Sequence, residues 1–275
     1  MSVLINYYSN EQELVKLANK TNKLFDNNIA LMIENYIYQE DITYYNNGAI
    51  KSRCMTKFGN KEGEGQVYYK NCLINKTQGL IKHLINYKDG EFHGKSESFY
   101  KDGQRKYLLY WDHGKRTGTY NEWRYDGSIK EISNWKDGEL HGLCQQWENG
   151  VLTHYTNWKD GKLHGMCREW WSNGNLKIRA SWKDGLKNGL CQEWWSNGQI
   201  YKQYICKDNK EDGNVTVWYS SETRRSIGAI ENGNKMVEGE YKDGVRNGKF
   251  TWWYANGEFG NESIWENGIC VRIIS

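Results

Sequence analysis

The chain has 275 residues, with 37 Lys+Arg against 34 Asp+Glu, 14 Trp, 29 Gly and no Pro. This composition excludes collagen-like, Pro-rich and polyelectrolyte chains, and no apolar run is long enough for a membrane-spanning helix. The first residues lack the basic and apolar regions of a secretory signal. The seven cysteines are odd in number and form no CxxC pair. We therefore expect an intracellular, cytoplasmic protein without a disulfide framework.

Residues 1–43 differ from the remainder and predict an N-terminal helical cap. A helix is expected from about residue 10 to residue 26, with Ser9 and Gln12 resembling a capping box. This helix either covers the open end of a sheet or docks a partner. One face of it carries Leu14, Leu17, Ala18, Thr21, Leu24 and Phe25.

The range 44–275 is built from repeats of about 24 residues, a period that indicates a repeat architecture. The first turn glycine recurs at an almost constant spacing, at Gly90, Gly114, Gly138, Gly161 and Gly185. The same spacing then reaches Asn209 and Gly233. The predicted repeat-turn glycines are Gly90, Gly94, Gly114, Gly138, Gly142, Gly161, Gly165, Gly174, Gly185, Gly189, Gly198, Gly244, Gly248 and Gly257.

Two stretches break the period, near residues 70–84 and 220–243. The first is too long and predicts an extra loop or strand. In the second, Gly244 follows Gly233 after less than half of the usual spacing. We therefore expect about half a unit to be missing or rearranged there.

Each unit has the pattern of a β-hairpin. In 166–182, two strand-like segments flank Asn173-Gly174, a dipeptide typical of hairpin turns. Alternation in 176–182 gives one buried and one wet face, and Lys183-Asp184-Gly185 makes the next turn. Single hairpins are barely stable, so stacking predicts a mainly β fold: a single-layer antiparallel β-hairpin solenoid that ends in an edge strand at 269–274.

Tryptophan recurs at fixed places in these units and predicts an aromatic spine. Large rings would fill the thin core that a one-layer sheet offers. The spine residues are Trp111, Trp135, Trp158, Trp170, Trp182, Trp194, Trp253 and Trp265.

The units resemble MORN repeats, in particular the variant of bacterial antitoxin-component-like proteins and of giant-virus MORN-repeat proteins. The resemblance rests on Trp170-Trp171, Asn173-Gly174, Leu163-His164-Gly165 and Lys183-Asp184-Gly185, and covers roughly residues 44–269. It departs at Asn209, near residue 220 and after Gly233. The resemblance implies a β-hairpin solenoid with non-enzymatic work, such as scaffolding, protein contacts or attachment to membranes.

Three sets of side chains recur at positions where chemistry is conceivable. The cysteines allow a soft-metal or redox site, but small apolar residues repeated with the unit explain them better. The histidines allow metal binding or pH sensing, but packing on or bonding to their own turns is the better interpretation. The aspartates fit turn chemistry rather than acid–base catalysis. We expect no catalytic, cofactor or metal site. The sets are Cys144, Cys167 and Cys191; His93, His141 and His164; and Asp89, Asp137, Asp160, Asp184 and Asp243.

The expected function is therefore a non-enzymatic scaffold or structural assembly component that binds protein partners, including a minor structural protein of a virus particle if the source is viral. An antitoxin-like inhibitor and a tether to anionic membranes are the alternatives. Charges alternate in sign along the units, which disfavours lipid, and no basic block suggests nucleic acid. The sheet edges also allow self-association.

Overall fold

A computed structural model of the chain describes residues 37–74, 78–220 and 233–274. The helix expected within residues 10 to 26 lies outside these ranges. The chain divides into two compact units, residues 1–116 and 117–275. Within the described ranges, no helix has the length and apolarity that crossing a membrane requires. The described part is almost entirely antiparallel β-structure, as the sequence predicts.

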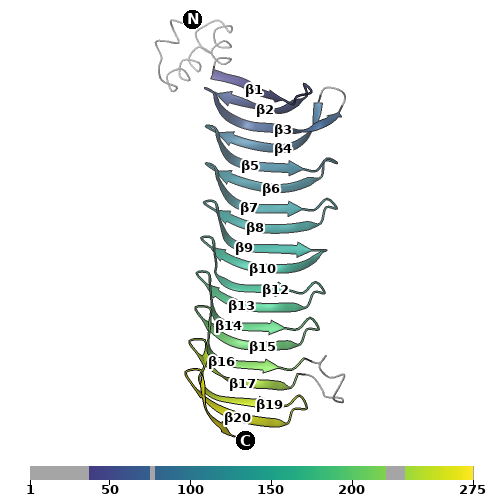
Figure 1. The fold of residues 1–275 in the computed structure, drawn as a ribbon. Coiled ribbons are helices and arrows are strands. Elements are labelled where there is room, and N and C mark those ends of the chain that lie inside the picture. Colours follow the sequence, from purple (N-terminus) through teal and green to yellow (C-terminus); the bar gives the residue numbers. More distant parts are fainter. Residues whose placement is uncertain (1–36, 75–77, 221–232, 275) are drawn as a thin grey trace, which may run out of the picture. The chain divides into compact units, whose positions relative to one another are not determined.

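The first unit consists of β-strands that each pair antiparallel with the next along the chain (Figure 1). β1 lies largely within the range predicted as the cap, so strand pairing begins earlier in the chain than we expected. The strands are β1 (Tyr38–Tyr44), β2 (Ile50–Lys57), β3 (Asn60–Ile74), β4 (Gln78–Lys88), β5 (Glu91–Phe99) and β6 (Arg105–Asp112).

The second unit continues the same pattern of hairpins from β7, which begins in the last residues of the first unit. β11 and β12 both pair with β10, and β18 and β19 both pair with β17, so each couple acts as one interrupted strand. The strands are β7 (Lys115–Trp123), β8 (Ile129–Lys136), β9 (Glu139–Glu148), β10 (Val151–Lys159), β11 (Lys162–Leu163), β12 (Gly165–Trp170), β13 (Leu176–Lys183), β14 (Leu186–Trp194), β15 (Ile200–Lys207), β16 (Lys210–Trp218), β17 (Lys235–Lys242), β18 (Val245–Arg246), β19 (Gly248–Trp253), β20 (Phe259–Glu266) and β21 (Ile269–Ile274).

The Asn-Gly turns close the hairpins through backbone and side-chain hydrogen bonds. In the turn between β12 and β13, the Trp171 N–H donates to Asn175 O at 2.8 Å, and the Asn175 N–H donates to Asn173 Oδ1 at 3.0 Å. Gly174 has a backbone φ of 87°, a value that residues other than glycine rarely adopt. The strand register shifts just before the turn, between Glu169 and Trp170, which marks a β-bulge.

The two irregular stretches are lengthened hairpins. Near residues 70–84 the extra residues extend β3 and β4, which still pair at Ile74 and Gln78. In the second stretch we expected half a unit to be missing or rearranged, and the described strands show a rearrangement with no strand of the hairpin missing. β16 pairs directly with β17, and the Tyr219 N–H donates to Asn234 O at 3.0 Å. Gly233 therefore belongs to the β16–β17 connection and not to the Lys-Asp-Gly series, because that connection carries the additional residues.

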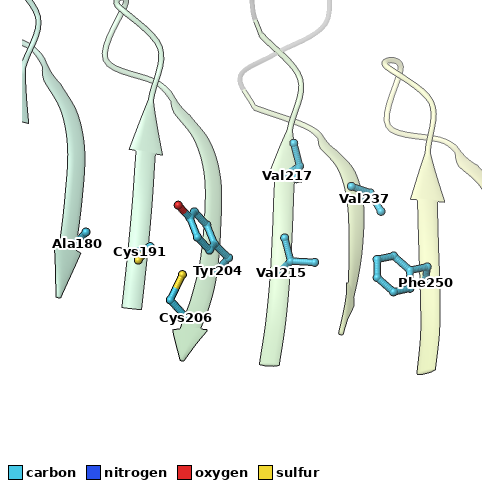
Figure 2. Close-up of a cluster of buried hydrophobic side chains, with 8 residues drawn as sticks. All are labelled: Ala180, Cys191, Tyr204, Cys206, Val215, Val217, Val237 and Phe250. Carbon is cyan, nitrogen blue, oxygen red and sulfur yellow. The ribbon is translucent and has the colours of Figure 1, made fainter. Parts of the chain in front are cut away.

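The core of the second unit is a row of small and medium side chains that crosses the strands on one face of the sheet. Ala180 pairs with Cys191, Cys191 with Tyr204, and Tyr204 with Val215, and Phe250 continues the row (Figure 2). The eight tryptophans of the predicted spine are all only partly buried. They flank the buried row and do not form it; apart from Tyr204 and Phe250, the row holds small and medium side chains.

Candidate interaction surface

The Lys-Asp-Gly turns stack on the preceding unit through backbone hydrogen bonds. The Gly161 N–H donates to Leu140 O at 3.0 Å, and the Gly185 N–H donates to Leu163 O at 2.9 Å. The aspartates before these glycines also have positive φ, 49° at Asp160 and 52° at Asp184. All fourteen predicted repeat-turn glycines have positive φ. The Lys-Asp-Gly turns therefore form one margin of the sheet within each unit, and the Asn-Gly turns lie at the opposite strand ends.

The recurring histidines bond to the turn of the following unit, not to their own turn as we expected. His141 Nδ1 lies 3.1 Å from Asp160 Oδ1, and His164 Nδ1 lies 3.3 Å from Asp184 Oδ1. The cause is the stacking of the turns, which places each His beneath the next Asp. These carboxylates are 66% and 62% exposed. Their geometry fits turn-to-turn contact rather than acid–base chemistry.

The tryptophan rows lie beside the buried row, and some of their indole N–H groups donate to hydroxyl groups on the same strand. Trp135 Nε1 donates to Ser133 Oγ at 3.0 Å, and Trp265 Nε1 donates to Ser263 Oγ at 2.8 Å. In each case the acceptor lies two residues earlier on the same strand, so both side chains share a sheet face. The half-exposed rings give this face an apolar but hydrogen-bonded border.

The repeated cysteines are buried and separated from one another. Cys144, Cys167 and Cys191 are 5%, 6% and 1% exposed. One strand lies between the strands of successive cysteines, which places them roughly 10 Å apart, too far to share a metal ion. Burial raises the pKa of Cys144 to about 11 and that of Cys191 to about 12. These thiols thus stay protonated at neutral pH, which disfavours nucleophilic or metal-ligating roles.

We expect these pKa shifts to control thiol labelling. A raised pKa lowers the thiolate fraction at pH 8, so a thiol-specific reagent should modify the exposed Cys270 within minutes and leave Cys144, Cys167 and Cys191 unmodified until the chain unfolds. Mass mapping of the labelled peptides checks the result, and the Cys270→Ser variant is the control. Rapid native labelling of the three buried thiols would contradict it.

An aromatic pocket lies at the C-terminal end of the second unit. Its cavity is about 410 Å³. Trp253 and Trp265 of the predicted spine contribute to it, while the other lining residues were not anticipated. The one sequence feature that could have predicted this pocket is the run of three aromatic residues at 252–254, which no other unit has in full. The pocket is lined by Tyr219, Trp252, Trp253, Tyr254, Gly260, Asn261, Ser263, Trp265, Cys270 and Ile273.

The strand beside this pocket, β21, presents a strongly apolar edge. Ile269, Val271 and Ile273 are 69%, 51% and 71% exposed. Within the described ranges β21 pairs with β20 alone. Ile273 stands opposite Ser263, and Ser263 pairs with Phe250 of the buried row. The buried row therefore continues at Ile273 onto β21, whose outer edge is unpaired in the described structure.

Comparison with family models places MORN repeats at residues 132–152, 157–176, 180–200 and 238–259, and the MORN repeat variant at 92–113. No curated protein matches the chain. Among solved structures, S. aureus TarM, a mutant in complex with Fondaparinux, alpha-GlcNAc-glycerol and UDP, is 13% identical at a TM-score of 0.24, covering 34% of this chain and 19% of that chain. The TcdB2-TccC3-Cdc42 structure is 12% identical at a TM-score of 0.19, covering 78% and 14%.

The chain thus spans less than a fifth of either solved structure, and these two likenesses carry no argument. The family match gives no support to the bacterial antitoxin or giant-virus subgroup. MORN repeats are usually non-catalytic and generally mediate interactions, and no enzyme homologue is identified. Five segments between residues 92 and 259 match MORN repeat models, so the chain contains MORN repeats.

Proposed function

We propose that this protein is a non-catalytic scaffold that binds an extended, apolar strand of a partner protein along β21. The observation that carries the proposal is the edge itself, where Ile269, Val271 and Ile273 are all more than half exposed. An apolar strand edge with free N–H and C=O groups is a template for another strand. Strand addition supplies backbone hydrogen bonds, and pockets for alternate side chains supply specificity.

The adjacent aromatic pocket offers such a specificity site. It holds Trp252, Trp265 and Ile273 around a cavity of about 410 Å³, which is in the range of sites that take a buried side chain or small group. An aromatic or branched side chain of the added strand would fill it. Aromatic anchors of this kind carry much of the energy of protein interfaces.

The edge strand at the other end of the described chain, β1, differs from β21 in carrying acidic side chains. β1 carries Glu40 and Asp41, and Glu40 pairs with Arg53 of β2 at 2.6 Å. Charged side chains of this type protect an edge against strand addition. β21 lacks acidic side chains of this kind and exposes three aliphatic ones, and that is where we place the partner.

A second copy of the chain is a less suitable occupant. An antiparallel pairing of two β21 strands about a two-fold axis would bring the two Arg272 side chains close together, since the strand is short. Like charges across strands destabilise the pair. A partner strand with an acidic residue near Arg272 avoids this repulsion.

The test is affinity purification from the native source, followed by mass spectrometry, with wild type, Ile273→Lys and a control. Leu186→Lys is the matched control, because Leu186 is 40% exposed on an interior strand. We expect a stoichiometric protein partner with wild type and Leu186→Lys, and at least a tenfold lower recovery with Ile273→Lys.

Other outcomes separate the alternatives. Recovery that Ile273→Lys leaves unchanged would contradict docking on β21. A dimer detected by light scattering that Ile273→Lys dissociates would identify the edge as a self-association site. Binding to anionic vesicles that weakens with salt, without a protein partner, would support the membrane tether instead. A single small partner encoded nearby would support the inhibitor.

A further inference from the structure

Two histidines and one aspartate meet at a turn of the first unit, far along the chain from β21. His93 belongs to β5, Asp112 is the last residue of β6, and His113 follows in the turn. Asp112 Oδ1 lies 3.4 Å from His93 Nδ1 and 2.7 Å from His113 Nδ1. The two imidazole rings have centroids 4.9 Å apart at 68°. The ligand atoms of all three groups lie within 4.8 Å of one another.

An altered turn sequence creates this cluster. The regular turn reads Lys-Asp-Gly, but here it reads Asp112-His113-Gly114. His113 takes the position of the turn aspartate and has φ of 44°. The Gly114 N–H donates to Phe92 O at 2.8 Å, which fixes the turn against the residue that precedes His93. The exchange thus adds a second imidazole where other units have only a His–Asp pair.

One nitrogen of the cluster lacks the partner that its burial calls for. His93 Nδ1 is inaccessible to solvent and has no hydrogen-bond partner of adequate geometry. A buried polar atom without a partner destabilises the fold, and its nearest oxygen is the Asp112 carboxylate. A cation held between these groups would supply the missing partner of His93 Nδ1. Across the described ranges, no other three-group cluster of His, Cys, Asp or Glu has this spacing.

The donor set selects the class of ion. Two imidazoles and one carboxylate suit first-row transition ions such as Zn²⁺, whereas Mg²⁺ and Ca²⁺ prefer oxygen ligands throughout. A tetrahedral Zn²⁺ ion with bonds of about 2.0–2.1 Å holds its ligands roughly 3.3 Å apart, close to the 3.4 Å between Asp112 Oδ1 and His93 Nδ1. The exposed His113 side chain, whose Nδ1 lies 2.7 Å from the same oxygen, would shift outward to admit the ion. The side chains of Asp112 and His113 are both 62% exposed, so water can complete the coordination. We propose that His93, Asp112 and His113 bind one divalent transition-metal ion.

The experiment is calorimetric titration of the full chain with ZnCl₂. All variants carry Cys270→Ser, which removes the one exposed thiol of the described side chains as a competing ligand. We expect one ion per chain, and at least a tenfold weaker affinity in each of His93→Asn, His113→Asn and Asp112→Asn. The matched controls His141→Asn and His164→Asn remove histidines of two-group pairs and should leave the affinity unchanged.

Two further readouts make the result decisive. Co²⁺ should give the absorption of a site with nitrogen and oxygen ligands, and His113→Asn should abolish it. Near-ultraviolet circular dichroism verifies the fold of each variant, and the exposed Asp112 and His113 positions tolerate substitution if His93→Asn does not fold. The absence of Zn²⁺ binding, or binding that survives His113→Asn and Asp112→Asn, would overturn the proposal.

Discussion

Replacing Phe250 by alanine should lower the free energy of unfolding by about 3–5 kcal/mol. Among the residues that the structure describes, Phe250 is the largest fully buried side chain, at 1% exposure. Its ring contacts the Tyr241 ring at a centroid distance of 5.6 Å and the Trp265 ring at 6.2 Å. It also fills the space over Gly239, which has no side chain of its own. The cavity left by Phe250→Ala therefore cannot close by a small rotation of a neighbour.

Denaturant unfolding measures this loss, together with hydrogen exchange of the β17, β19 and β20 amides, because a repeat array can open in parts. Val245→Ala is the control, since Val245 is 42% exposed on β18, and its cost should stay within about 0.5 kcal/mol. A cost below about 1.5 kcal/mol for Phe250→Ala would show that the ring is not packed as the structure places it.

The turns of this protein are predictable from sequence because their cause is local. Positive φ at Gly174 or Gly185 depends on that residue and its immediate neighbours. The alternation of apolar residues then specifies the hairpins and the final strand, β21. Extending the regular spacing of turn glycines to Gly233 failed because that position depends on the length of a connection and not on local turn chemistry. A lengthened connection changes the spacing without changing which strands pair, and only the pairing of β16 with β17 reveals it.

The core and the candidate sites depend on neighbours that are distant in sequence, and there the prediction was weaker. Residue size suggested that tryptophan fills the core, but the strand centres hold Ser133, Ala180 and Cys191, each nearly inaccessible. The histidines were recognised as a series, yet their true partners are aspartates in the turn of the following unit. His93 gained a second imidazole neighbour only because one turn departs from Lys-Asp-Gly. Such departures from the repeat are where function specific to one unit can arise.

Gly239→Ala should destabilise the protein by about 1–3 kcal/mol, although alanine is intrinsically better than glycine in a strand by roughly 0.5–1 kcal/mol. A Cβ at this position would lie 2.6 Å from Phe250 Cε1 and closer still to Cδ1, so either the ring or the strand must move. Gly239 and Phe250 thus act as a complementary pair on β17 and β19.

A double-mutant cycle measures that complementarity. In a Phe250→Val background the Gly239→Ala substitution should cost little or become stabilising, because the smaller side chain frees the space that the new methyl group needs. The coupling should reach about 1–3 kcal/mol. Gly239→Ala combined with Thr156→Ala, several strands away, should instead give additive costs. If Gly239→Ala alone is neutral, the packing of the Phe250 ring on Gly239 does not stabilise the contact between β17 and β19. The cost of Phe250→Ala must then come from the contacts of its ring with Tyr241 and Trp265.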